Sequence, residues 1–310
     1  FEGEQNEILT KTIIDIFSDE IHSASTARVT GEWKWLQENK QKGFIDSLIK
    51  GNSKTISLFL TNMFKNEVTY GYISPSFSDA LENEKNVSSN ILCNIDSCIE
   101  FSDLSSENQL ETSHGNPFSL LGSQGVILPD TPRHYYYGYI ISKLLNAKVS
   151  PSIVEIGGGY GDSCLQTWKR FKGNCTITNI DLLPGLIATY FYLSKYKIPV
   201  NFVRSGEKVK EKSVNLISAS SLGSLDSLCN KTDLIFNSRS FSEMSKDTIS
   251  SYFYFINNSG AEYFYHENSN FILFTESKRH IEIRADSFPI DESKYFLQHK
   301  SIFSQSILVT

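Results

Sequence analysis

The chain of 310 residues is long enough for about two domains, and its 40% hydrophobic and 13% aromatic residues exclude a largely disordered protein. Its 29 Lys and Arg against 35 Asp and Glu give a net charge of −6, which argues against nucleic acid or an anionic membrane surface as the main partner. No apolar run approaches the roughly 18 residues of a membrane-spanning helix, so no transmembrane segment is expected.

The first part of the chain, residues 1–110, is predicted to be a helical region. Apolar side chains recur at helical spacing between Glu7 and about Phe64, whereas residues 71–130 are rich in Gly, Ser, Asn and Pro and predict an irregular connection. We expect the helical region either to cap the domain that follows or to form a homodimer interface, and the periodicity does not choose between these alternatives. The chain begins with Phe1 and not with Met, which indicates one segment of a longer polypeptide.

The second part, residues 111–310, is predicted to be an α/β domain. A helix is expected from Thr131, with Thr131 as the capping residue and Pro132 at the first helical position, to about Asn146. Strands and helices then alternate, which is typical of a doubly wound, mostly parallel, Rossmann-like sheet. The expected strands are 152–156, 176–180, 200–203, 214–217, 233–237 and 261–265. One helix is expected to end near 171, and two others are expected to span 185–196 and 243–257.

A glycine-rich loop follows the first of these strands. It reads Glu-Ile-Gly-Gly-Gly-Tyr-Gly-Asp from Glu155 to Asp162 and lies between a strand and a helix, where nucleotide-type ligands meet open α/β sheets. Glycines let the backbone turn sharply and approach a ligand without Cβ atoms in the way. Asp181, 20 residues after Gly161, ends the next strand and is suited to accept hydrogen bonds from the two hydroxyls of a ribose.

Three interpretations of this loop are open: a dinucleotide site, an S-adenosylmethionine site, or a turn that binds nothing. A dinucleotide fingerprint needs its third glycine at position 162, which is Asp. The spacing E-x-G-x-G-x-G instead resembles the class I S-adenosylmethionine-dependent methyltransferases, and an acid such as Glu155 can help to neutralise the ammonium group of that cofactor. We therefore expect S-adenosyl-L-methionine as the cofactor, bound by Glu155, Gly157, Gly158, Gly159, Tyr160, Gly161, Asp181 and Leu182.

Four blocks in chain order resemble a bacterial family of sugar O-methyltransferases. They are Gly-Asn-Pro-Phe at 115–118 with Asp-Thr-Pro-Arg-His-Tyr-Tyr-Tyr at 130–137, Val-Glu-Ile-Gly-Gly-Gly-Tyr-Gly at 154–161, Ile-Asp-Leu at 180–182 followed by Pro184, and the segment from Asp233 to Met244. Leu183 departs from the family's I-D-L-P. The resemblance leaves the helical region and the tail beyond about Phe271 unmatched. It implies methylation of a hydroxyl on a sugar or a surface glycan precursor.

Methyl transfer to a hydroxyl is helped by a general base and by groups that hold the acceptor in line. The candidates for the base are His266 at the carboxyl edge of the predicted sheet, His114 in the loop-rich connection, and Glu243. Ser240 and Glu243 also form an S-x-x-E pattern, so a helix capping box is the alternative for Glu243. The residues expected to hold the acceptor are Asn116, Arg133, Asn237, Arg239 and Ser240, with pairing to Asp130 as the alternative for Arg133.

Further expectations concern metals, compartment and competing functions. No metal is expected, because Asp181 is assigned to the ribose and no second pair of acids is seen at the sheet edge. Five cysteines without a C-x-x-C pair predict free thiols in a reducing compartment, and hence a cytoplasmic protein. The alternatives to a sugar O-methyltransferase are an O-methyltransferase for a non-sugar metabolite and a non-catalytic nucleotide-binding domain of a larger assembly.

Overall fold

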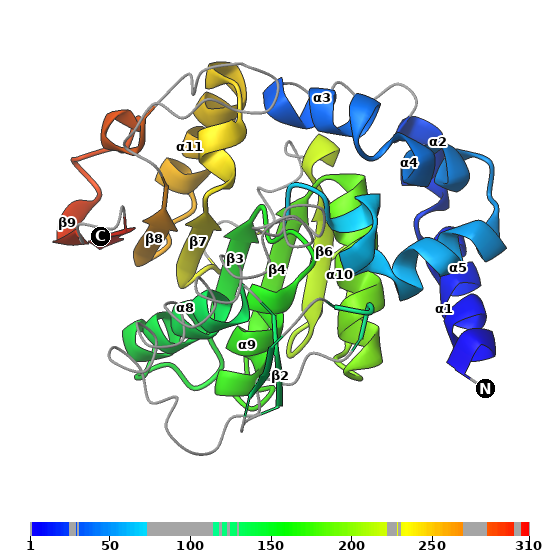
Figure 1. The fold of residues 1–310 in the computed structure, drawn as a ribbon. Coiled ribbons are helices and arrows are strands. Elements are labelled where there is room, and N and C mark those ends of the chain that lie inside the picture. The colour runs from blue at the N-terminus through cyan, green and yellow to red at the C-terminus, as the bar shows by residue number, and fades with distance from the viewer. Residues whose placement is uncertain are drawn as a thin grey trace.

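The structure is a computed structural model. It describes residues 2–24, 29, 31–72, 114–117, 120–122, 125–128, 130–221, 228, 231–268, 284–300 and 305–309. In these residues the N-terminal helices lie to one side of a sheet that is flanked by further helices (Figure 1). None of the helices in the described ranges is both long and apolar enough to cross a membrane.

The described part of the N-terminal region is helical. Its helices are α1 (Glu2–Ile16), α2 (Ser18–Ala24), α3 (Gly31–Asn39), α4 (Lys42–Ile49) and α5 (Ser53–Thr61), followed by 3-10 turns at Met63–Lys65 and Glu67–Thr69. Asn52 begins α5 by accepting a hydrogen bond from the Thr55 amide at 3.2 Å. α1 packs against both α5 and α10 (Leu183–Lys195). The stretch beyond Tyr72, and with it the boundary predicted near residue 110, lies outside the described residues.

An eight-stranded sheet forms the centre of the α/β part, in the order β5-β6-β4-β3-β7-β8-β10-β9. The doubly wound, mostly parallel sheet that the sequence predicts is confirmed. Its parallel strands are β3 (Ser152–Ile156), β4 (Thr176–Asp181), β5 (Val200–Phe202), β6 (Val214–Ser218), β7 (Leu234–Ser238) and β8 (Tyr263–Glu267). β10 (Gln305–Val309) runs antiparallel to β8 and to β9 (Phe296–Lys300). The strand order reverses between β3 and β7, so the loops that follow these two strands meet at the topological switch point.

The side chains of each strand alternate between two buried faces. One face, with Ile153, Phe236 and Tyr265, shares a core with α8 (Thr131–Leu144), α9 (Asp162–Arg170), α10 and residues of α1. The opposite face, with Val154, Ile235 and Phe264, is covered by α11 (Lys246–Asn258). Burial on both sides explains why these strands read as continuous apolar runs in the sequence.

α8 and α9 cross at very close range. A Cβ atom at Gly138 of α8 would lie 3.1 Å from the backbone carbon of Gln166 and from the backbone nitrogen of Thr167 in α9. This is closer than nine in ten real Cβ contacts, so the crossing distance depends on glycine at this position. α8 begins beside the N-terminus of α9, which places the first turn of α8 next to the glycine loop.

Several local expectations are wrong. Thr131 does not cap α8, because the N-cap residue is Asp130 and the Thr131 hydroxyl donates to Asp162 instead. Ser240 and Glu243 form no capping box: they lie in a separate 3-10 helix, η4 (Ser240–Glu243), and Ser245 caps α11. β8 begins two residues later than predicted. The part expected to be irregular contains a hairpin of β1 (Leu120–Gly122) and β2 (Gly125–Ile127), and β9 and β10 in the tail were not predicted.

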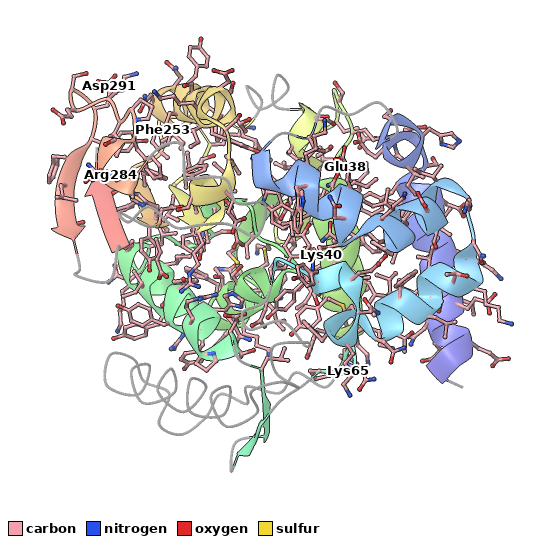
Figure 2. All side chains as sticks on the ribbon, turned by 45° about the horizontal axis from the view of Figure 1, so that its top comes forward. Glu38, Lys40, Lys65, Phe253, Arg284 and Asp291 are labelled. Carbon is pink, nitrogen blue, oxygen red and sulfur yellow. The ribbon has the colours of Figure 1, made fainter. Side chains whose placement is uncertain are left out.

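The N-terminal helices extend over the carboxyl edge of the sheet. In Figure 1 the arrowheads of β3, β7 and β8 point toward the side on which α3 lies, and α3 contacts η4 directly after β7. Figure 2, in which this side comes forward, shows α3 with Glu38 in front of the sheet. The carboxyl edge, where the glycine loop lies, is therefore bordered by both parts of the chain.

Candidate functional site

The glycine loop requires glycine because of its backbone conformation and because of the side chains packed against it. Gly157, Gly159 and Gly161 all have positive φ, at 74°, 60° and 92°. A Cβ at Gly157 would lie 2.2 Å from the Ser240 Oγ, and one at Gly161 would lie 2.7 Å from Cγ2 of Thr189. The loop is thus packed between η4 and α10 at the carboxyl edge of β3.

Asp181 is tied to this loop. Its Oδ2 accepts a hydrogen bond from the Gly159 amide at 2.7 Å, and its Oδ1 accepts one from the Leu182 amide at 2.6 Å. Burial raises the pKa of Asp181 to about 7, although both amide hydrogen bonds oppose the shift. The structure therefore brings together Gly159, Asp181 and Leu182, which the sequence analysis assigned to one site, and gives the carboxyl group a charge that changes near neutral pH.

Glu155 faces α9 from the middle of the sheet. Its carboxylate accepts hydrogen bonds from the Ser163 hydroxyl and, at 2.9 Å, from the Cys164 thiol. Burial raises the pKa of Glu155. These contacts attach the first turn of α9 to β3, and a direct role toward an ammonium group stays a prediction.

Tyr160 turns into the core beside the loop. Its ring is 1% exposed and makes edge-to-face contacts with Phe64 at 4.9 Å and with Tyr192 at 5.4 Å. Phe64 belongs to the N-terminal region and Tyr192 to α10. Tyr160 thus joins the loop to both parts of the chain.

Asn237 and Ser240 fix the loop after β7 against the glycine loop. The Asn237 side-chain amide donates to the Ile156 carbonyl at 2.8 Å and to the Ser240 Oγ at 2.6 Å. Asn268, which follows β8, donates to Asn237 Oδ1 at 2.7 Å. Because Ser240 also lies against Gly157, these two predicted acceptor-binding residues hold the positions of both loops.

Arg239, which follows β7, and Glu267, at the end of β8, form a charged pair. Arg239 has a left-handed backbone with φ 63°, and its amide donates to the Glu267 carbonyl at 2.6 Å. Its Nε lies 3.3 Å from Glu267 Oε1, with the Arg239 side chain half exposed and the Glu267 side chain 11% exposed. Ser238 donates to the hydroxyl of Tyr137, in α8, at 3.0 Å. The site thus presents a guanidinium and a carboxylate side by side at the carboxyl edge.

Arg133 pairs with Asp130, which is one of the two alternatives predicted for it. The distance from Arg133 Nη2 to Asp130 Oδ1 is 2.7 Å, and the Asp130 side chain is 2% exposed. Arg133 Nε is buried without a hydrogen-bond partner in the described residues. The guanidinium is therefore only partly satisfied by Asp130.

The two histidines proposed as bases pack against aromatic rings. His266 is 2% exposed on the α11 face of β8, with its ring 5.1 Å from Phe264 and 5.3 Å from Phe288. His114 packs on Tyr196 at the C-terminal end of α10, and the neighbouring Asn116 donates to Asn62 at 2.8 Å. Within the described ranges no three His, Cys, Asp or Glu side chains are grouped so that they could hold a metal ion.

The sequence analysis missed a histidine–carboxylate pair between α8 and the residue that directly follows the glycine loop. His134 Nδ1 is 2.9 Å from Asp162 Oδ2, and Asp162 also accepts from Thr131 at 3.0 Å and Gln166 at 2.9 Å. Burial alone would raise the pKa of Asp162, but the hydrogen bond and charge of His134 outweigh it and lower the value. An acid directly after the glycine loop and a histidine four residues into the Asp130 block were the available sequence signals.

Comparison with other proteins yields similarity to solved structures alone. The sequence matches no protein-family model and no curated protein sequence. A cyclopropane-fatty-acyl-phospholipid synthase-like protein from Lactobacillus casei is 15% identical, with a TM-score of 0.31 over 45% of this chain and 50% of its own. Phosphoethanolamine N-methyltransferase 2 of Haemonchus contortus, in complex with phosphomonomethylethanolamine and S-adenosylhomocysteine, is 16% identical, with a TM-score of 0.32 over 46% of this chain and 30% of its own.

The PH0226 protein of Pyrococcus horikoshii is 8% identical, with a TM-score of 0.38 over 55% of this chain and 88% of its own. The chain thus spans half or less of the length of the first two proteins. Similarity at this level concerns the fold, which the strand order and register of this chain already establish. The chemistry of the site rests on its own residues, and the resemblance of the four sequence blocks stays a prediction.

Proposed function

We propose that this chain is an S-adenosylmethionine-dependent O-methyltransferase that acts on a sugar hydroxyl. The observation that carries the proposal is the contact between Gly159 and Asp181 at the switch point of the sheet. It puts a carboxyl group beside the glycine loop, where an acid is suited to accept hydrogen bonds from the two hydroxyls of a ribose.

The first turn of α9 favours this cofactor over a dinucleotide. A pyrophosphate would bind at a helix N-terminus, where amide groups and the helix dipole attract negative charge. Asp162 brings a carboxylate with a lowered pKa to that turn, which makes the turn less suited to a second negative group. S-adenosylmethionine has no phosphate and supplies an activated methyl group on a positively charged sulfur.

The pair of Arg239 and Glu267 supports a hydroxyl acceptor. A carboxylate accepts the proton of a hydroxyl, and an adjacent guanidinium donates to its oxygen, so the pair holds a hydroxyl from both sides. In the proposed reaction the acceptor oxygen forms a bond to the methyl carbon, the carbon–sulfur bond breaks, and Glu267 takes the hydroxyl proton. Glu243, His266 and His114 are the other candidates for the base.

Calorimetric titration with S-adenosylhomocysteine tests the cofactor. We expect binding by the wild-type protein and a loss of at least about 100-fold in affinity for Asp181→Ala, because each lost hydrogen bond to a charged group is worth about 1.5–3 kcal/mol. Asp286→Ala, which removes an exposed carboxylate elsewhere, is the matched control. Absence of binding by the wild type, or equal binding by Asp181→Ala, contradicts the proposal.

Transfer of a labelled methyl group to a panel of acceptors tests the substrate. We expect labelling of sugars or sugar-containing precursors and its loss in Glu267→Gln, with cofactor binding unchanged. Labelling of a non-sugar hydroxyl compound alone would favour the alternative metabolite methyltransferase. Cofactor binding without transfer to any acceptor would favour a non-catalytic domain of a larger assembly.

A further inference from the structure

A tyrosine from the N-terminal region lies directly on the glycine loop. The position that a Cβ would take at Gly159 is 3.3 Å from Cδ1 and 3.5 Å from Cβ of Tyr72. The Tyr72 ring stacks on Trp33 of α3, with 4.7 Å between ring centroids and 26° between ring planes. Trp33 is buried, and α3 contacts η4 on the other side of the loop. One aromatic ring of the N-terminal region thus lies against the loop that the proposed function assigns to the cofactor, and a second ring stacks on the first.

Tyr72 is held in this place by Gln41 and α3. The Gln41 side-chain amide donates to the carbonyls of Val68 at 3.4 Å and Tyr70 at 3.0 Å, and the Tyr72 amide donates to the Thr69 carbonyl at 2.9 Å. Gly71, with φ 86°, packs against Trp33. The chain that carries Tyr72 therefore has a defined conformation in which its side chain points at the loop.

Two buried polar atoms at this contact have no hydrogen bond of normal geometry within the described residues. They are the Tyr72 hydroxyl and Gln41 Oε1. Burial raises the pKa of the Tyr72 hydroxyl and the charges of Asp181 and Glu243 raise it further, whereas hydrogen bonding toward the Gln41 side chain and the Gly185 backbone opposes the shift. Buried polar groups without a partner are costly, and in native proteins they are usually satisfied by water or by a ligand.

The composition of this contact selects the chemistry of its ligand. Asp181, Glu243 and Gln41 Oε1 offer acceptors beside the stacked rings of Tyr72 and Trp33. Such surroundings suit a ligand that brings hydrogen-bond donors and positive charge. The hydroxyl and ammonium groups and the sulfonium of S-adenosylmethionine have both properties.

We propose that Tyr72 and Gln41 bind the cofactor together with the glycine loop, so that the N-terminal helical region is part of the cofactor site. This inference rests on the proposed function. It makes Tyr72 and Gln41 cofactor-binding residues that lie far from the glycine loop in the sequence, and it couples cofactor binding to the position of α3 through Trp33.

Titration with S-adenosylhomocysteine tests this inference in the full chain. We expect about tenfold weaker binding for Tyr72→Phe, which removes one hydrogen-bonding hydroxyl, and about 100-fold weaker binding for Tyr72→Leu, which also removes the ring. Tyr254→Leu, at a 72% exposed tyrosine of α11, is the matched control and should bind like the wild type. Thermal unfolding of each variant shows whether the fold is retained.

The outcomes separate the two proposals. Binding by the wild type with equal affinity in both Tyr72 variants overturns this inference and leaves the proposed function standing. No binding by the wild type overturns both.

A second readout does not depend on the Tyr72 variants. The chain has three tryptophans, so Trp35→Phe with Trp168→Phe leaves Trp33 as the single fluorophore. Because Trp33 stacks on Tyr72, we expect saturating S-adenosylhomocysteine to change its emission. Unchanged Trp33 emission in a protein that binds the ligand by calorimetry overturns the inference.

Discussion

The two parts of the molecule form their share of the site in different ways. In the α/β part, residues close in sequence and their backbone amides form the glycine loop, and one carboxyl group from the neighbouring strand completes it. The helical part reaches the same place through side chains that depend on long-range packing. It is attached by contacts such as Lys195 Nζ to Asn6 Oδ1 at 2.8 Å and Arg204 Nη2 to the Ile16 carbonyl at 2.8 Å. A local motif thus supplies one wall of the site, and tertiary structure supplies the other.

The largest expected effect concerns the attachment of the helical part. Phe17 is fully buried, 4.4 Å from the ring of Phe202 and 5.9 Å from that of Tyr190. We expect Phe17→Ala to lower the free energy of unfolding by about 4 kcal/mol, because it removes buried apolar contacts and leaves a cavity. Urea denaturation measures the change.

Leu58→Ala, at a 63% exposed position of α5, is the control for Phe17→Ala and should change the stability by less than about 0.5 kcal/mol. A single cooperative transition in the wild type that splits in two for Phe17→Ala would show that the two parts are separable folding units. A loss below about 1 kcal/mol would contradict the view that this contact holds the parts together.

An intermediate effect is expected within the glycine loop. Gly157→Ala combines a positive φ with a Cβ 2.2 Å from the Ser240 Oγ, and we expect it to cost about 3 kcal/mol of stability. Gly206→Ala separates the two causes, since Gly206 has φ 84° and nothing lies within 4 Å of its Cβ position. It should cost only about 1 kcal/mol, from backbone strain alone.

The double variant Gly157→Ala with Ser240→Gly should recover part of this loss in urea denaturation. Equal losses for Gly157→Ala and Gly206→Ala would show that the contact between the two loops is unimportant.

The smallest effect is a dependence on pH. Asp181 has a pKa of about 7 in the folded chain against 3.8 for the free group, so its contribution to stability is fully present below about pH 4 and is lost as the pH rises through about 7. Binding that needs the ionised carboxylate changes in the opposite direction. We expect the affinity for S-adenosylhomocysteine to fall by up to about tenfold per pH unit below pH 7. Calorimetry between pH 5.5 and 8.5 measures it, and the same slope in Asp181→Asn would contradict the assignment.

Much of the α/β part could be predicted from the sequence because its signals are local. Strands such as β3 and β4 are buried on both faces, so they appear as short apolar runs, and the glycine loop and Asp181 follow these runs directly. The capping pattern at Ser240 and Glu243 was misleading because Ser240 bonds to Asn237 and packs on Gly157. A local pattern cannot reveal that a tertiary contact has already used one of its members.

The residues that the sequence could not identify are those placed by tertiary contacts. Tyr72 lies at the start of the stretch predicted to be an irregular connection, and nothing near it in the sequence indicates that it meets Gly159. Glu267 is the last residue of β8, whose end was predicted two residues early, so the sequence analysis assigned His266 and not Glu267 to the edge. The alternation of side chains along β8 then puts the two residues on opposite faces of the sheet.

The close crossing of α8 and α9 at Gly138 affects the geometry of the site. The first turn of α8 carries Arg133 and its middle carries Tyr137, which meets Ser238 beside the charged pair, while α9 begins at the glycine loop. At Gly138 the separation of the two helices depends on a hydrogen atom in place of a methyl group. Under the proposed function, the alignment of acceptor and cofactor would thus depend on a glycine in the middle of α8.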